Sequence, residues 1–235
     1  NSNVIRLNKN RFRPDYDKKK KLSQFFPKIN LSTLTIIFFC VFVMIIGTFS
    51  LIPVGLWNNE ILFNPFSYFS DFSNIYLTLL THLYSPQIPS ALFVGGLLRP
   101  VYAVSAIIVY ILLGLIGVPV FASGGGLTYV FEPTFGYLLA FTVGAFIVSV
   151  GFSRKKMSSL LYLGIIIIAV LSIHLMGGLY LIANLKLSGV DFLSILKWLY
   201  SLSLVNIFPD IIFAIILCAI ARQLKILPLL LTGKD

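Results

Sequence analysis

The chain has 235 residues, of which 58% are hydrophobic and only 11% are charged, and its formal net charge is +10. A soluble globular domain carries about 25% charged residues, so this chain has too few polar side chains to cover the surface of a soluble fold. Composition and a mean hydropathy of +0.95 therefore exclude an ordinary soluble domain and indicate an integral membrane protein.

Six apolar segments follow one another along the chain, separated by polar, glycine-containing or proline-containing residues. A helix that crosses the hydrocarbon core of a bilayer needs roughly 20 apolar residues. The segments that we expect to be helical are residues 31–52, 86–98, 100–117, 134–152, 158–183 and 204–221. Residues 86–98 are short for a span, so this helix should either borrow length from the preceding segment or be partly re-entrant. The pattern predicts an all-α bundle of about six transmembrane helices.

Two segments differ from the helical ones in composition. Residues 1–30 are basic and polar, and we expect them to be a tail before one membrane domain at 31–235. We expect this domain to have a long, aromatic-rich external loop at 53–85 with a short helix near 73–83. Lysines beside a bilayer attract anionic headgroups at about 1 kcal/mol each. The tail lacks the interleaved aromatic residues and folded module of a nucleic-acid binder. We therefore expect it to contact membrane lipids or a protein partner, and no nucleic acid.

The distribution of positive charge predicts the orientation of the chain. Sixteen of the eighteen Lys and Arg residues lie in the tail, at Arg99, at residues 154–156 and after residue 221. Cytoplasmic segments are enriched in Lys and Arg. Both termini are therefore expected to be cytoplasmic, in the cell inner membrane or an internal membrane.

The sequence has no pattern typical of an enzyme. His82 and His174 do not combine with Cys or carboxylate residues at the spacing of metal ligands. The glycine run at 124–126 lacks the Lys and Ser/Thr of a phosphate-binding loop. Cys40 and Cys218 lie in apolar segments, where cysteine behaves as a small hydrophobic residue. We expect no enzymatic activity, no metal and no cofactor.

Polar residues nevertheless converge toward the external side of the predicted bundle. They are Gln87, Asn184, Asn206 and Asp210, together with the glycines Gly124, Gly125 and Gly126. The glycine run is either a flexible turn or a loop whose amides approach a ligand closely. Asp210 is either a first-turn anion, stabilised by roughly 0.3–1 kcal/mol by the helix dipole, or an acceptor for ligand N–H groups. His174 is expected to be a hydrogen-bonded packing residue. A few convergent polar groups beside an apolar bundle are typical of a ligand pocket.

One stretch of the chain resembles a known family. Residues 112–122 read Leu-Leu-Gly-Leu-Ile-Gly-Val-Pro-Val-Phe-Ala, and residues 133–138, after the glycine run, read Pro-Thr-Phe-Gly-Tyr-Leu. These segments, with matching residues from Gln87 to Asp210, resemble the BioY family, the biotin-specific S components of energy-coupling factor (ECF) transporters. The resemblance covers roughly residues 86–225.

The resemblance implies a six-helix fold that binds biotin or a related small molecule from outside, beneath a loop lid. It also implies two kinds of partner, a transmembrane T component and a pair of ATPase subunits. By position it transfers a binding role to Gln87, the lid glycines 124–126, Tyr137 and Asp210. We add Asn184 to these candidate ligand-binding residues because of its predicted external position.

A second interpretation stays open, that of a BioY-like fold acting as a structural or assembly subunit of a larger membrane complex. It depends on three differences from the family pattern. Phe213 stands at the position of a lysine, Glu132 and Phe135 stand at two glycine positions, and residues 31–52 contain no alanine for a small-residue helix contact.

Overall fold

The computed structural model describes residues 31–53, 83–154 and 157–232. The predicted tail at 1–30, most of the predicted external loop at 53–85, and almost all of the predicted short helix near 73–83 lie outside these residues.

The six predicted helices are present in the described residues; two of them begin at the predicted residue, and the other ends differ from the prediction by one to eleven residues. They are α2 (Leu31–Phe49), α6 (Gln87–Leu97), α7 (Pro100–Leu115), α8 (Phe135–Gly151), α9 (Ser159–Leu187) and α11 (Ile207–Thr232). Between α7 and α8 lies a short 3-10 helix, Leu127–Phe131. Strands β1 (Ile52–Pro53) and β2 (Leu83–Tyr84) pair antiparallel beside the end of α2.

The connector between the fifth and sixth predicted helices, residues 184–203, is largely helical, although no helix was predicted there. Helix α9 continues to Leu187. Gly189, two residues after its last residue, has a φ of 74°, which suits the glycine that commonly follows a helix end. A further helix, α10 (Phe192–Leu199), follows, and a π-helical turn at Tyr200–Leu204 leads into α11. The Asp191 carboxylate accepts the amide N–H of Ser194 at 2.9 Å and so caps α10. Hydrogen bonds from Ser194 hold the pKa of Asp191 below its ordinary value.

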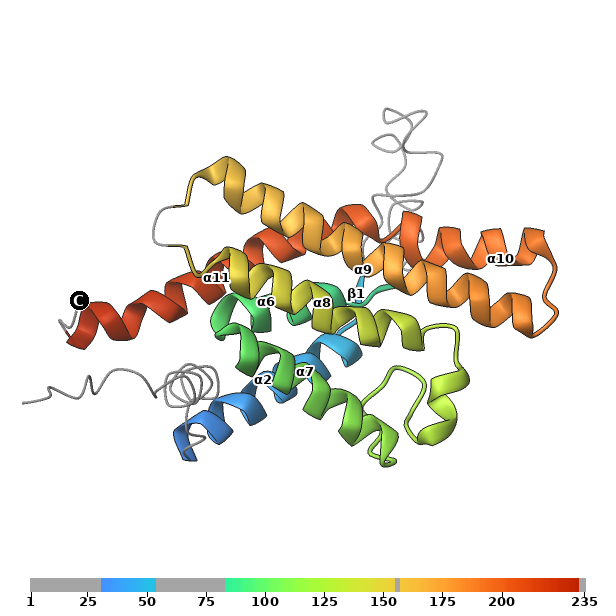
Figure 1. The fold of residues 1–235 in the computed structure, drawn as a ribbon, viewed down its shortest axis with the longest axis horizontal. Helices are drawn as coiled ribbons and strands as arrows, with labels where there is room; N and C mark the ends of the chain where they lie inside the picture. The colour runs from blue at the N-terminus through green and yellow to red at the C-terminus, as the bar shows by residue number, and fades with distance from the viewer. Residues whose placement is uncertain (1–30, 54–82, 155–156, 233–235) are drawn as a thin grey trace, which may run out of the picture.

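Helix α6 lies at the centre of the bundle. It packs between α8 and α11, while α7 packs on α8, and α2 packs on α6 and α7 (Figure 1). Nine of its eleven residues are buried. The close contact with α8 requires Gly95, because a Cβ atom there would lie 2.4 Å from the carbonyl oxygen of Ala145. This short helix therefore has protein on every side.

The outer faces of the helices carry many exposed large apolar side chains. Examples are Phe38 and Phe42 on α2, Phe146 on α8 and Leu175 on α9, all more than 45% exposed. Helix α9 and the continuous stretch Phe192–Lys225 are long and apolar enough to cross a membrane. Helices α6, α7 and α8 are shorter, with 11, 16 and 17 residues. Such an apolar outer surface suits contact with lipid.

Candidate ligand-binding site

A cavity of about 340 Å³ lies at one end of the bundle. Its walls come from β2, the N-terminal ends of α6 and α8, the loop between α7 and α8, and the segment that leads into α11. The volume falls in the range of about 300–1,000 Å³ that is usual for small-molecule sites. Its walls combine apolar side chains such as Ile88 and Phe141 with hydroxyl, amide and carboxylate groups.

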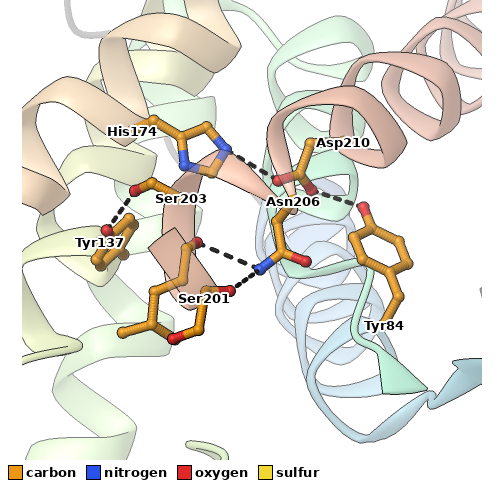
Figure 2. A network of polar contacts seen from close by, with 8 residues as sticks. Tyr84, Tyr137, His174, Ser201, Ser203, Asn206 and Asp210 are labelled. Carbon is orange, nitrogen blue, oxygen red and sulfur yellow. Dashed lines mark hydrogen bonds and ion pairs between the residues drawn. The ribbon is translucent and has the colours of Figure 1, made fainter. Parts of the chain in front are cut away.

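Asp210, in the first turn of α11, is the buried acid of this cavity and is 2% exposed. The Tyr84 hydroxyl donates to one carboxylate oxygen at 2.6 Å, and the His174 Nε2 atom lies 3.0 Å from the other (Figure 2). Tyr84 also stacks on Phe213, with ring centroids 5.3 Å apart. Three elements, β2, α9 and α11, therefore meet at one carboxylate.

His174 faces Asp210 from α9 and is 5% exposed. Its Nδ1 atom is buried and has no hydrogen-bond partner among the described residues. In the tautomer with the proton on Nε2, the ring donates to Asp210, and Nδ1 is left as an acceptor and not as an unpaired N–H donor. His174 is thus the hydrogen-bonded packing residue that its sequence position suggested.

A second group of polar residues lies near Asp210, on α8 and on the segment that leads into α11. The hydroxyls of Tyr137 and Ser203 are 2.5 Å apart, and the Asn206 amide donates to the carbonyl oxygens of Ser201 and Leu202 (Figure 2). Ser201, Leu202 and Ser203 belong to the π-helical turn before α11. Such turns break the regular helical hydrogen bonding and are frequent at functional sites.

The loop between α7 and α8 closes one side of the cavity through Ala122 and Ser123. Gly124 and Gly126, which follow, have φ values of 109° and 113°, a conformation that L side chains rarely adopt. Their amides donate to the carbonyl oxygens of Phe121 and Gly114. The glycine run therefore forms a tight turn that is bonded to its own surroundings.

Three side chains hold this loop onto the helices. Tyr110 of α7 donates to the carbonyl of Val120 at 3.1 Å. On α9, Tyr180 donates to the carbonyl of Val130, and Asn184 donates to the carbonyl of Phe131 at 3.0 Å. The loop is thus fastened at both ends to two different helices.

The structure brings some of the predicted site residues together and places others nearby. Gln87, Tyr137 and Asp210 line one cavity, as does Asn206. Asn184 and the glycines 124–126 are not among its described lining residues. The glycines form a turn within the loop between α7 and α8, and Asn184 donates a hydrogen bond to that loop. Sequence reasoning missed Tyr84, whose only sequence signal is its position three residues before Gln87.

The opposite end of the bundle is basic. Arg99 precedes α7, Arg154 follows α8, and Arg222 and Lys225 lie near the end of α11. Arg222 lines a separate open groove between α9 and α11. The cavity and the described basic residues at 99, 154, 222 and 225 therefore lie at opposite ends of the same helices.

Comparison with known proteins reveals related sequences. A model of the BioY family matches residues 72–228. A protein of Pyrococcus horikoshii named probable biotin transporter BioY is 31% identical over 140 residues, which are 59% of this chain and 78% of that protein. One of Lysinibacillus sphaericus with the same name is 49% identical over 49 residues, so the match spans 21% of this chain and 25% of that protein.

A solved structure has the same fold. It is the S-component for biotin from an ECF-type ABC transporter, with a TM-score of 0.56 and 24% identity over 85% of this chain and 95% of that one. The relatives are named as transporters and not as enzymes, which agrees with the expectation from the sequence. Because the family model covers more than half of the chain and the fold agrees with it, the chain belongs to the BioY family.

Proposed function

We propose that this chain is the substrate-capture S component of an energy-coupling factor transporter and binds biotin in the cavity at Asp210. The observation that carries the proposal is a buried carboxylate in the wall of a cavity of ligand size. The names of the relatives and of the structural neighbour support biotin as the ligand.

The chemistry of the cavity suits the head of biotin. The bicyclic ureido group offers two N–H donors and one carbonyl acceptor. The Asp210 carboxylate accepts N–H groups, and the amides of Gln87 and Asn206 can donate to a carbonyl. Ile88, Leu138 and Phe141 provide apolar walls for the fused rings and the aliphatic chain. A site that hydrogen-bonds its ligand in this way rejects analogues that lack these groups.

Transport requires partners in this proposal. The sequence lacks a phosphate-binding loop, so ATP is hydrolysed by separate ATPase subunits, coupled through a T component. The basic end of the bundle faces the cytoplasm, and the cavity therefore opens to the external side. The bundle crosses the membrane several times, with the short helix α6 enclosed by the others, which makes the protein multi-pass with both termini inside.

One observation favours the second candidate, a structural subunit of a larger membrane complex. Both carboxylate oxygens of Asp210 already face a donor of the protein itself, Tyr84 and His174. A ligand must therefore share or displace these contacts, whereas a purely structural role would leave them unchanged.

Calorimetry of the detergent-purified chain with biotin tests the proposal. We expect tight binding that Asp210→Asn weakens strongly, because the neutral amide replaces an acceptor by a donor. Asp191→Asn is the matched control, since Asp191 is an exposed aspartate outside the cavity. No heat at millimolar biotin from a sample with a cooperative thermal unfolding transition would refute biotin capture and favour the structural role.

A further inference from the structure

The cavity has an unusual charge for a site proposed to bind an acid such as biotin. Among the described residues that line it, Asp210 is the only charged one. The remaining polar groups are hydroxyls and carboxamides, for example Ser123, Thr134 and Asn206. The cavity therefore offers no described cation to the carboxylate at the end of the biotin side chain.

Neither the sequence that precedes β2 nor the described basic residues at this end of the bundle place a cation in the cavity. Residues 54–82, which precede β2, include Glu60 and Asp71 but no Lys or Arg. Lys186 and Lys197 lie toward the same end as the cavity, yet both are exposed and neither is among its lining residues. His174 does not line the cavity, and any positive charge on it would be neutralised by Asp210 at 3.0 Å.

A negatively charged ligand group gains little binding free energy in a cavity without a cation. Removing a carboxylate from water is costly unless a cation or several hydrogen bonds compensate it. The Asp210 carboxyl supplies no positive charge to this cavity and, when ionised, repels a second negative charge beside it. A neutral amide avoids both costs, and the hydroxyls that line the cavity can donate to it and accept from it.

We propose that this cavity selects its ligand by the neutral ureido head alone, and binds biotin derivatives with an uncharged side-chain terminus at least as well as free biotin. The inference rests on the proposed biotin-binding function. The ligands expected for this cavity are biotin compounds whose side chain ends in an amide or an ester. Free biotin also binds, but with no higher affinity than these compounds.

Calorimetry with biotin and with biotinamide, under the same conditions, provides the first test. We expect the dissociation constant of biotinamide to be equal to or lower than that of biotin. A preference for biotin above about tenfold, which corresponds to 1.4 kcal/mol, would overturn the inference and leave the proposed function intact. If neither compound binds to the folded protein, the proposed function itself fails, and the inference with it.

A charge introduced at the cavity provides the second test. Ser123 is exposed and lines the cavity, so Ser123→Lys adds a cation at its mouth with little risk to folding. We expect Ser123→Lys to shift the affinity ratio toward biotin by about five- to tenfold, and the shift to shrink at high salt. Ser123→Met is the control of similar length and should leave the ratio unchanged. Equal ratios for the two variants would contradict the inference.

Discussion

At the scale of single residues, the site depends on how the buried carboxylate of Asp210 is compensated. A buried carboxylate without donors is strongly destabilising, and here Tyr84 and His174 each face one oxygen. These contacts join residues that are 126 and 36 positions apart in the sequence. They therefore connect β2, α9 and α11, three elements that are far apart in the sequence.

The Tyr84 hydroxyl is the contact that can be removed most cleanly. Tyr84→Phe keeps the stacking on Phe213 but deletes the donor to Asp210, so we expect the free energy of unfolding to fall by about 1.5–3 kcal/mol. Denaturation in mixed micelles measures this change in the free energy of unfolding. Tyr102→Phe is the control, because the Tyr102 hydroxyl has no hydrogen bond within the described residues. Equal effects of the two substitutions would show that the Tyr84 contact adds no stability.

Sequence patterns predicted part of this site. Asp210 was found because it is an acid in an apolar segment, and Gln87 and Tyr137 because they match the family pattern. Tyr84 could not be found in this way, since its role arises only when β2 lies beside α11. Asn184 was predicted to bind the ligand from the external side, but it is not among the described lining residues of the cavity and donates instead to the carbonyl of Phe131 in the loop, a partner that the sequence does not reveal.

At the scale of helices, the contact between α6 and α8 depends on the absence of one side chain. Gly95→Ala places a Cβ atom 2.4 Å from the backbone oxygen of Ala145, which cannot rotate away. We expect a loss of about 1–3 kcal/mol in the free energy of unfolding, as is usual for overpacking. The measurement is the same denaturation in mixed micelles.

The matched control for this substitution is Gly164→Ala on α9. A Cβ atom there has no neighbour within 4 Å. We expect Gly164→Ala to be neutral or to stabilise the helix by up to roughly 1 kcal/mol, because alanine loses less backbone entropy than glycine. A similar loss in both variants would mean that close packing of α6 on α8 is not the cause.

The loop between α7 and α8 should control how long a ligand stays bound. Removing its hydrogen bonds to α9 with Tyr180→Phe or Asn184→Ala should raise the dissociation rate of biotin by about two- to tenfold each, with a smaller change in the association rate. Stopped-flow or surface-based kinetics would measure both rates. Ser188→Ala removes only a bond to the same helix and should leave the rates unchanged.

Helix positions were predictable because long apolar runs and the prolines and glycines between them mark the ends. The missed helix, α10, has an exposed polar residue at Lys197 and is only eight residues long, so its sequence resembles a connector. Its start depends on the Asp191 cap and on Gly189, two signals that are weak in isolation.

At the scale of the whole molecule, the charge distribution predicts which end faces the cytoplasm. A cysteine in place of Ser123 should react with a membrane-impermeant maleimide in intact cells, and one in place of Arg154 only after permeabilisation. The native Cys40 and Cys218 are 0% exposed and should not interfere. The opposite labelling pattern would mean that the proposed orientation is inverted.

The overall arrangement was only partly accessible from the sequence. Hydropathy predicts the number of long helices and their order, but not which of them lies in the middle. The central position of α6 depends on close contacts at glycines, such as that of Gly95 with Ala145. These contacts join residues that are distant in the sequence, so a sequence pattern predicts them only weakly.

The short length of α6 has a consequence for where empty space exists in this protein. Eleven residues of helix rise only about 16 Å, roughly half of the thickness of a hydrocarbon core. Gln87 and Ile88, where the helix begins, line the cavity. The cavity therefore lies beside the N-terminal end of the central helix, in the direction in which a longer helix would continue. Space for a ligand exists here because the central helix begins late, and β2, the loop between α7 and α8 and the segment before α11 form the other walls.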